Sequence, residues 1–238
     1  MKRILPLVLL LAPALLHAQL RQSDYFAAGS SALTDGFSVK LVNVSSYTIG
    51  KLNLTAGLQF TLDGSDQQAF SGWSAGAGYR FLDERFPLDL QLFFMQNPYS
   101  PLTRENNSCL TLSHRWDHFE LLLGNNTRSW KLAAGEVDPD GLPDGTDYRV
   151  TEYRNLIYRF TAYLFAPSSP WNLSLTLTDM DDFLIQQETN PMISAAFRSE
   201  VKPGLTLFTE AWYQGAGMLN LHADYFGFYL KGGVQWQL

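Results

Sequence analysis

The chain has 238 residues with a formal net charge of −6, and only 17% of them are charged while 14% are aromatic. A single Cys excludes a disulfide scaffold and any metal site built from several cysteines, and the acidic balance without a basic run excludes nucleic acid as a partner. A mean hydropathy of −0.10 in so uncharged a chain indicates a molecule that is apolar on one side and polar on the other.

Residues 1–18 have the features of a secretory signal peptide. Two basic residues precede an apolar run (residues 4–16), and Ala18 supplies the small residue at the expected cleavage site. The run is shorter than the roughly 20 residues that a membrane-spanning helix needs. We therefore expect cleavage after Ala18, export from the cytoplasm, and a mature chain of residues 19–238 that forms a single domain.

Alternation of apolar and polar residues dominates the mature chain. Residues 52–62 place Leu, Ala or Phe at every even position, residues 73–81 place Ala or an aromatic residue at every odd position, and the longest alternating segment is 226–238. A period of two predicts β-strands with one polar and one apolar face. The pattern shows neither helical periodicity nor an apolar run long enough for a membrane helix.

Clusters of Gly, Asn, Asp and Pro divide this pattern into twelve predicted strands, within a range of ten to fourteen. Their expected bounds are 36–45, 50–62, 71–82, 87–96, 107–115, 118–124, 127–135, 150–165, 171–185, 192–200, 204–214 and 225–238.

Both a soluble β-sandwich and a transmembrane β-barrel produce such alternation. Aromatic residues on the apolar faces, such as Trp73, Trp171 and Trp236, and opposite faces rich in Gly, Ser, Thr, Asn and Gln favour the barrel. The sequence therefore predicts an all-β protein that forms a closed antiparallel transmembrane β-barrel, with a soluble periplasmic sandwich as the alternative.

The last predicted strand carries a family resemblance. In the segment FGFYLKGGVQWQL, Val234, Trp236 and Leu238 occupy alternate positions, and Tyr229 lies further in. This segment resembles the C-terminal assembly signal of bacterial outer-membrane β-barrel proteins, a porin-like class, although Leu replaces the aromatic residue favoured at the last position. The resemblance implies location in the outer membrane, insertion by the barrel-assembly machinery, and contact with outer-membrane lipid and lipopolysaccharide.

If both termini face the periplasm, as in that class, strand order assigns each connection to a side. The expected periplasmic turns are 125–126, 167–170 and 201–204, and the expected extracellular loops are 136–149, 186–191 and 215–224. The connections 63–70 and 97–106 fit less well, because they are long for periplasmic turns. The 136–149 loop carries five carboxylates, but their spacing lacks the pattern of a calcium loop, and a solvated loop explains them more simply.

Placing the polar positions of each strand inward predicts the lining of the lumen. The inward bases are Lys40, Lys51, Arg80, Arg115, Lys131, Arg159, Arg198 and Lys231, and the inward acids are Asp89, Glu120, Glu200 and Glu210. A cationic lining inside a low-dielectric wall attracts anions. The alternative is that these charges pair across a barrel of intermediate width and close it.

Candidate catalytic residues are few. Ser113, His118 and Glu120 share the inward parity around a short predicted turn and could supply a nucleophile, a base and an orienting acid, although ordinary hydrogen bonding in a lumen explains the same residues. His114 points to the opposite face from Ser113, so these two side chains cannot meet. Cys109 falls on the inward parity and is expected to be inert.

The sequence thus predicts a small outer-membrane barrel that acts as a narrow channel for the diffusion of small hydrophilic solutes, including anionic ones. No enzymatic activity, cofactor or metal is expected. The alternatives are a plugged barrel with a structural or surface-interaction role through the 136–149 loop, and a barrel hydrolase that uses the Ser113, His118 and Glu120 neighbourhood.

Overall fold

The computed structural model describes residues 18–31, 36–62, 70–82, 86–98, 103–132, 149–166, 169–179, 192–214 and 227–238. Within these ranges the regular secondary structure consists of twelve β-strands. They are β1 (Ala18–Ser31), β2 (Gly36–Ile49), β3 (Leu52–Thr61), β4 (Phe70–Phe81), β5 (Leu88–Pro98), β6 (Thr103–Arg115), β7 (Phe119–Leu132), β8 (Arg149–Tyr163), β9 (Trp171–Thr178), β10 (Met192–Lys202), β11 (Leu205–Gln214) and β12 (Gly227–Gln237). No described helix is long and apolar enough to cross a membrane.

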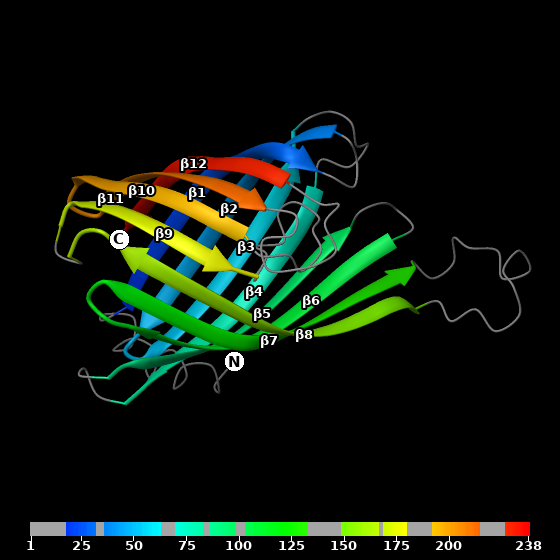
Figure 1. Cartoon of the computed structure of the whole chain (residues 1–238), viewed down its shortest axis with the longest axis horizontal. Helices are drawn as coiled ribbons and strands as arrows, with labels where there is room; N and C mark the ends of the chain where they lie inside the picture. Colours follow the sequence, from blue (N-terminus) through cyan, green and yellow to red (C-terminus); the bar gives the residue numbers. More distant parts are fainter. Residues whose placement is uncertain are drawn as a thin grey trace, which may run out of the picture.

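The strands form one closed barrel in which each strand pairs with its sequence neighbours and β1 pairs with β12 (Figure 1). All of these pairings are antiparallel. Closure satisfies the backbone groups that an open sheet would leave unpaired at its edges. The predicted fold class, a closed antiparallel barrel of twelve strands, is therefore confirmed.

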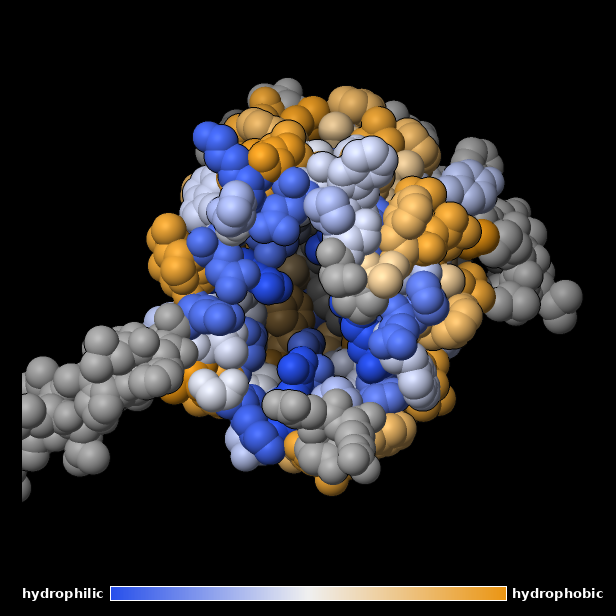
Figure 2. Space-filling model, turned by 90° about the vertical axis from the view of Figure 1, so that its left-hand side faces the viewer, coloured by the Kyte–Doolittle hydropathy of each residue, from blue (hydrophilic) through white to orange (hydrophobic). Residues whose placement is uncertain are grey.

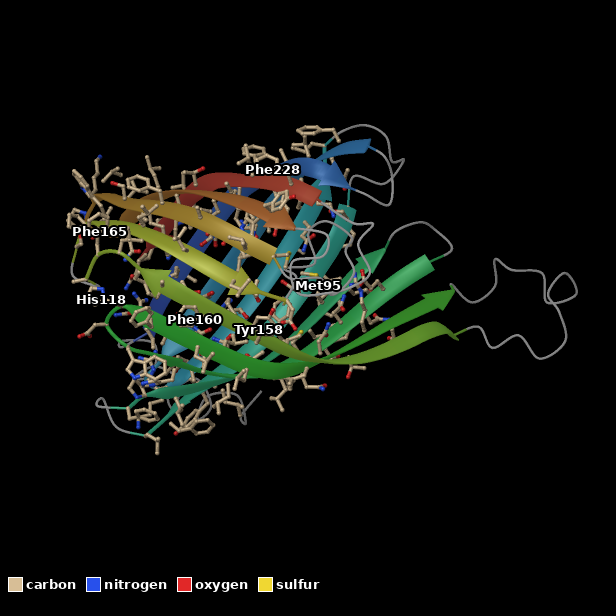
Figure 3. The ribbon with its side chains drawn as sticks, in the orientation of Figure 1. Met95, His118, Tyr158, Phe160, Phe165 and Phe228 are labelled. Atoms are coloured by element: carbon tan, nitrogen blue, oxygen red, sulfur yellow. The ribbon has the colours of Figure 1, made fainter. Side chains whose placement is uncertain are left out.

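Strand alternation separates an apolar outer surface from a polar interior. On β3, Leu54 and Leu58 are exposed on the outside, whereas Gln59 is buried inside. Phe228 likewise projects from the outer surface of β12 (Figure 3). Figure 2 shows hydrophobic residues around the outside and hydrophilic residues around a central hollow. Amphipathic strands give this arrangement directly, because successive side chains point to opposite faces.

The two ends of the barrel differ in their connections. One end, here called the short-turn end, contains the turns at Gly50 and Lys51 and at Pro203 and Gly204, and it also holds Leu20 and Leu238, which exchange backbone hydrogen bonds. Gly50 and Gly204 have φ angles of 57° and 77°, a left-handed conformation that glycine adopts without steric cost. The longest connections, at 133–148, 179–191 and 215–226, join strands at the opposite end, here called the long-loop end.

The predicted number of strands is right, although two of the predicted strand assignments are wrong. The strand β1 was not predicted, and the two strands predicted at 118–124 and 127–135 are one continuous strand, β7. Asn125 and Asn126 therefore form no turn and instead pair with Leu110 and Cys109 on β6. The added strand β1 and the fusion of two predicted strands into β7 leave the total at twelve.

Side chains fill much of the interior from its middle toward the long-loop end. Met95, Cys109 and Ile157 form one buried cluster, against which Phe93 packs, and Met95 lies between the barrel walls in Figure 3. Ala27, Val42 and Tyr229 form a second buried cluster. Nearer the long-loop end, Arg128 donates a hydrogen bond from Nε to Glu105 Oε1 in a fully buried ion pair. The interior is therefore narrow at this level.

Candidate functional site: a basic cavity in the barrel interior

A cavity of about 630 Å³ occupies the barrel interior between the short-turn end and the middle. Inward positions of β1, β2 and β6 to β12 line it. In Figure 2, which views the short-turn end, the hollow is bordered by hydrophilic residues. The alternation of the strands creates this site, because their outward residues are apolar and their inward residues are polar.

Cationic side chains outnumber carboxylates around the cavity. The cationic lining residues are Arg21, Arg115, Arg159, Arg198 and Lys231, and the anionic ones are Glu120 and Glu210. Each carboxylate accepts hydrogen bonds from a separate group of neighbours.

Glu120 on β7 holds the first group. Its Oε1 accepts a hydrogen bond of 3.1 Å from Arg159 Nη2, and its Oε2 accepts one of 2.8 Å from the hydroxyl of Tyr163. The guanidinium of Arg115 lies 4.0 Å from the centre of the Tyr163 ring, a cation–π contact. The carboxylate thus fixes one arginine directly, and the tyrosine that it holds supports a second.

Glu210 on β11 holds the second group. Its Oε1 accepts a hydrogen bond of 2.9 Å from Arg198 Nη2, its Oε2 accepts one of 3.2 Å from Trp212 Nε1, and Lys231 Nζ lies 3.8 Å from Oε2. Lys231 Nζ is also 4.9 Å from the Trp212 ring. Arg198 keeps 51% of its side chain exposed, so it is held in place and still accessible from the cavity.

Two arginines of the lining have no carboxylate partner within the described part of the chain. Neither Arg21 nor Arg115 lies within ion-pair distance of a described Asp or Glu. The cavity therefore presents guanidinium donors whose charge is incompletely balanced. Guanidinium groups bind carboxylate, phosphate and sulfate oxygens through paired hydrogen bonds, so the arrangement suits an anionic ligand.

The structure places Lys51, Glu200, Arg80 and Asp89, which were also predicted to line the lumen, outside this cavity. Lys51 donates a hydrogen bond of 3.1 Å to the Leu82 carbonyl, and Glu200 accepts one of 3.0 Å from the Gly204 backbone N–H, both at the short-turn end. Arg80 pairs with Asp89 through two hydrogen bonds of 2.7 and 2.9 Å. These four charged side chains are therefore bonded to neighbouring groups of the barrel wall and its turns.

Two further lining candidates differ in their outcome. Lys40 is on the inward alternation of β2, opposite Ala27. Lys131 falls on the outward alternation of β7, because the strand is continuous and Arg128, three residues earlier, points inward. The side chain of Lys131 lies outside the described residues.

Sequence reasoning missed Arg21, because β1 was not predicted. The signal was present in the alternation of Arg21, Ser23 and Tyr25, all of which line the cavity. This alternation is hard to recognise because Gln22 and Asp24, at the positions between them, are polar where a strand of this kind is expected to be apolar. The aromatic residues Tyr163 and Trp212, which hold the two carboxylates, were also missed.

The candidate catalytic residues are not assembled into a site. Ser113 and Glu120 point inward as expected, but His118 Nδ1 lies 3.1 Å from the Tyr163 carbonyl at the short-turn end, where Figure 3 places this exposed residue. No hydrogen bond joins Ser113, His118 and Glu120 among the described residues, and Glu120 is occupied by Arg159 and Tyr163. No group of three or more described His, Cys, Asp or Glu residues is arranged to hold a metal ion.

The residues of the proposed assembly signal divide between the two faces of β12. Val234 and Trp236 pair with the outward Leu207 and Leu205, and Leu238 is exposed. Tyr229 is on the inner face, where it is buried and its ring stacks on Trp212 at a centroid distance of 5.7 Å. The acidic 136–149 loop falls outside the described residues except at Arg149.

No family model matches the chain, and no characterised protein sequence matches it. Solved structures do resemble it. The KdgM porin is 9% identical, with 90% of this chain and 98% of that chain covered at a TM-score of 0.52. The NanC porin is 12% identical, with 90% and 100% covered at a TM-score of 0.51. Outer membrane phospholipase A from Escherichia coli is 9% identical, with 90% and 92% covered at a TM-score of 0.46. By its closed, antiparallel, twelve-stranded architecture, the chain has the outer-membrane β-barrel fold that the KdgM and NanC porins share.

Proposed function

We propose that the protein resides in the bacterial outer membrane and admits small hydrophilic anions through its basic interior. The observation that carries this proposal is the cavity lining, where five cationic side chains meet two carboxylates. Within a wall surrounded by lipid, this excess of positive charge raises the local concentration of anions.

The membrane location is supported by the outer surface. Large apolar side chains are exposed all around the barrel, for example Leu92 on β5, Leu123 on β7, Leu175 on β9 and Leu230 on β12. An extensive apolar belt of this kind is unfavourable in water and suits contact with lipid. The fold shared with two porins supports the same location.

Conductance and ion selectivity in planar lipid bilayers test the channel. We expect discrete openings with a reversal potential that shows a preference for chloride over potassium. The Arg21→Gln/Arg115→Gln variant should lower this preference severalfold, because it removes the two cavity arginines that lack a described carboxylate partner. Lys51→Gln/Lys202→Gln is the matched control, since it removes the same charge from positions that do not line the cavity.

The second candidate is a plugged barrel, whose interior is blocked by side chains and which has a structural or surface-interaction role. The packed clusters around Met95 and Tyr229 and the buried pair of Glu105 and Arg128 favour it. Correctly folded protein that gives no discrete channels would support this candidate and contradict the proposed channel. A Glu105→Ser/Arg128→Ser variant that conducts where the parent does not would show that this pair closes the interior.

A hydrolase is the least supported function, because the structure does not join Ser113, His118 and Glu120. Assay of the parent and the Ser113→Ala variant on phospholipid and ester substrates tests it. We expect no hydrolysis by either protein, and activity that the substitution abolishes would overturn this expectation.

A further inference from the structure

The outer surface carries a group of polar side chains on β1 and β2. Gln22 and Asp24 occupy outward positions of β1, and their strand partners on β2 are Ser45 and Asn43. Their outward direction follows from Arg21, Ser23 and Tyr25, the alternate positions that line the interior cavity. We call Gln22, Asp24, Asn43 and Ser45 the outer polar cluster.

The outer polar cluster lies inside the apolar belt, not at its edge. Along β1, outward Leu20 precedes it toward the short-turn end and outward Phe26, 54% exposed, follows it toward the long-loop end. Sideways, its neighbours are Val234 on β12 and Leu58 on β3. If the barrel spans a membrane, as proposed above, the cluster faces hydrocarbon, where exposed polar groups are costly.

Hydrogen bonds inside the cluster meet part of this cost. Asp24 Oδ1 accepts a hydrogen bond from Asn43 Nδ2 and a longer one, 3.4 Å, from Gln22 Nε2. Ser45 Oγ donates a hydrogen bond of 2.6 Å to Gln22 Oε1. The four side chains thus form one network, held across the pairing of β1 and β2.

The network leaves both donors and acceptors open. Within the described residues, Asp24 Oδ2 and Asn43 Oδ1 accept no hydrogen bond, and the amide groups of Gln22 and Asn43 each use one of their two hydrogens. Lipid chains cannot satisfy these atoms. A partner at this depth must itself be embedded in the membrane and must offer both donors and acceptors.

We propose that the outer polar cluster is the centre of a symmetric dimer interface, in which two copies of this chain face each other across β1 and β2. Under two-fold symmetry, a patch that contains both donors and acceptors can pair with its own copy, because each donor is brought opposite an acceptor. The open carboxylate oxygen of Asp24 in one copy meets the open amide hydrogens of Asn43 or Gln22 in the other. Polar contacts of this kind stabilise association in lipid, where burial of apolar surface contributes little.

The surface around the cluster permits close approach. Small outward residues lie beside it, namely Ala56 on β3, which pairs with Ser45, and Gly232 on β12, two residues from Val234. At Gly232 the nearest atom to an added Cβ is the Phe208 carbonyl oxygen at 4.0 Å, so the space outside this position is open. Close approach of two barrels is therefore easiest on these sides of the cluster, between the larger outward side chains Phe26 and Leu58.

Cross-linking of the full chain in lipid vesicles tests the interface directly. Ser45→Cys places a thiol in the cluster, and Ser108→Cys places one on the outward face of β6 in the opposite wall. The only native cysteine, Cys109, is fully buried in the interior. A short thiol-specific cross-linker should yield severalfold more dimer from Ser45→Cys than from Ser108→Cys. Equal yields, or cross-links only to other proteins in native membranes, would overturn the proposal.

Removal of the polar groups supplies an independent readout. In Asp24→Leu/Asn43→Leu, we expect the dimer dissociation constant in detergent micelles to rise by roughly 10-fold or more, while Ser108→Leu should leave it unchanged. Sedimentation measures association, and heat-dependent gel mobility confirms that each variant is folded. A parent protein that is monomeric in both micelles and vesicles, or a dimer that survives the double substitution, contradicts the proposed interface.

Bilayer conductance of the same variants separates this proposal from the proposed channel. If the dimer is lost and channels are retained, the channel proposal is unaffected. If a dimer forms and no channels are seen, only the channel proposal is refuted.

Discussion

The environments of His114 and Ser113 show how strand parity decides the role of a side chain. His114 points outward, where its ring stacks on Phe86 at a centroid distance of 3.9 Å, and its Nδ1 lies 2.7 Å from the Pro87 carbonyl. Ser113, its neighbour in sequence, faces the interior. The histidine is therefore held by an aromatic environment at the short-turn end of the outer surface and is separated from the serine by the wall itself.

The buried pair of Glu105 and Arg128 should be sensitive to loss of either partner. Glu105→Leu or Arg128→Met alone should lower the free energy of unfolding by about 3–5 kcal/mol, because each breaks a buried ion pair. The double substitution should recover part of this loss, since it removes both charges of the pair. Denaturant titration in lipid vesicles measures all three variants, and additive losses would contradict the expectation.

Asp179 should give stability a pH dependence at the long-loop end. It follows β9, its Oδ1 accepts a hydrogen bond of 2.6 Å from the Tyr158 N–H, and burial raises the pKa of its carboxyl above the ordinary value. The folded state then holds the proton at a higher pH than the unfolded state. Stability relative to the Asp179→Asn variant should consequently rise as the pH falls from neutral through the raised pKa. Unfolding titrations at several pH values check this, and a difference that is constant with pH would refute it.

At the scale of whole strands, the clearest predictions fall on those whose outer face is uniformly apolar. The strands β3 and β9 begin close to their predicted positions because Leu alternates with polar residues along them. The strand β1 could not be recognised from alternation, because the polar residues Gln22 and Asp24 occupy outward positions where apolar residues are expected. The strand β7 was divided because Asn125 and Asn126 have the composition of a turn, whereas pairing with β6 and β8 keeps them extended. Tertiary pairing overrides local propensity in that case.

The joint between β12 and β1 should depend on one glycine and not on its neighbour. A Cβ at the inward Gly233 would overlap the Asp24 carbonyl oxygen and the Tyr25 Cβ, whereas a Cβ at the outward Gly232 would meet no atom closer than 4.0 Å. Gly233→Ala should lower the free energy of unfolding by about 1–3 kcal/mol, and Gly232→Ala should change it by less than about 0.5 kcal/mol. Equal effects of the two substitutions in denaturant titrations would count against this packing.

For the molecule as a whole, the two strand errors explain the connections that fitted poorly. An additional first strand reverses the direction of every predicted strand before β7, which moves the connections 63–70 and 97–106 to the long-loop end. The fusion within β7 restores the original direction for the rest of the chain.

The site was predictable only in part. The inward parity of Arg115, Arg159 and Arg198 follows from alternation, but the pairing of Arg159 with Glu120 and of Arg198 with Glu210 requires the folded barrel.

The anion preference of the proposed channel should weaken with salt. The excess charge of the cavity acts through a Debye length of about 10 Å at 0.1 M salt and about 3 Å at 1 M. The preference for chloride over potassium should fall when reversal potentials are measured at the same concentration ratio but at higher absolute concentration. A preference that is independent of ionic strength would indicate that contact binding, and not the field of the cavity, selects the ion.

The hydrogen bond between Gln237 Nε2 and Gln19 Oε1, at 3.1 Å, joins residues 218 positions apart. It belongs to the pairing of the first and last strands, so the barrel cannot close until both ends of the chain are present together. Every partly completed sheet exposes two unpaired edges, which are open to association with other chains. Closure of the barrel therefore requires contacts between distant parts of the chain, and such long-range pairing carries a large loss of chain entropy.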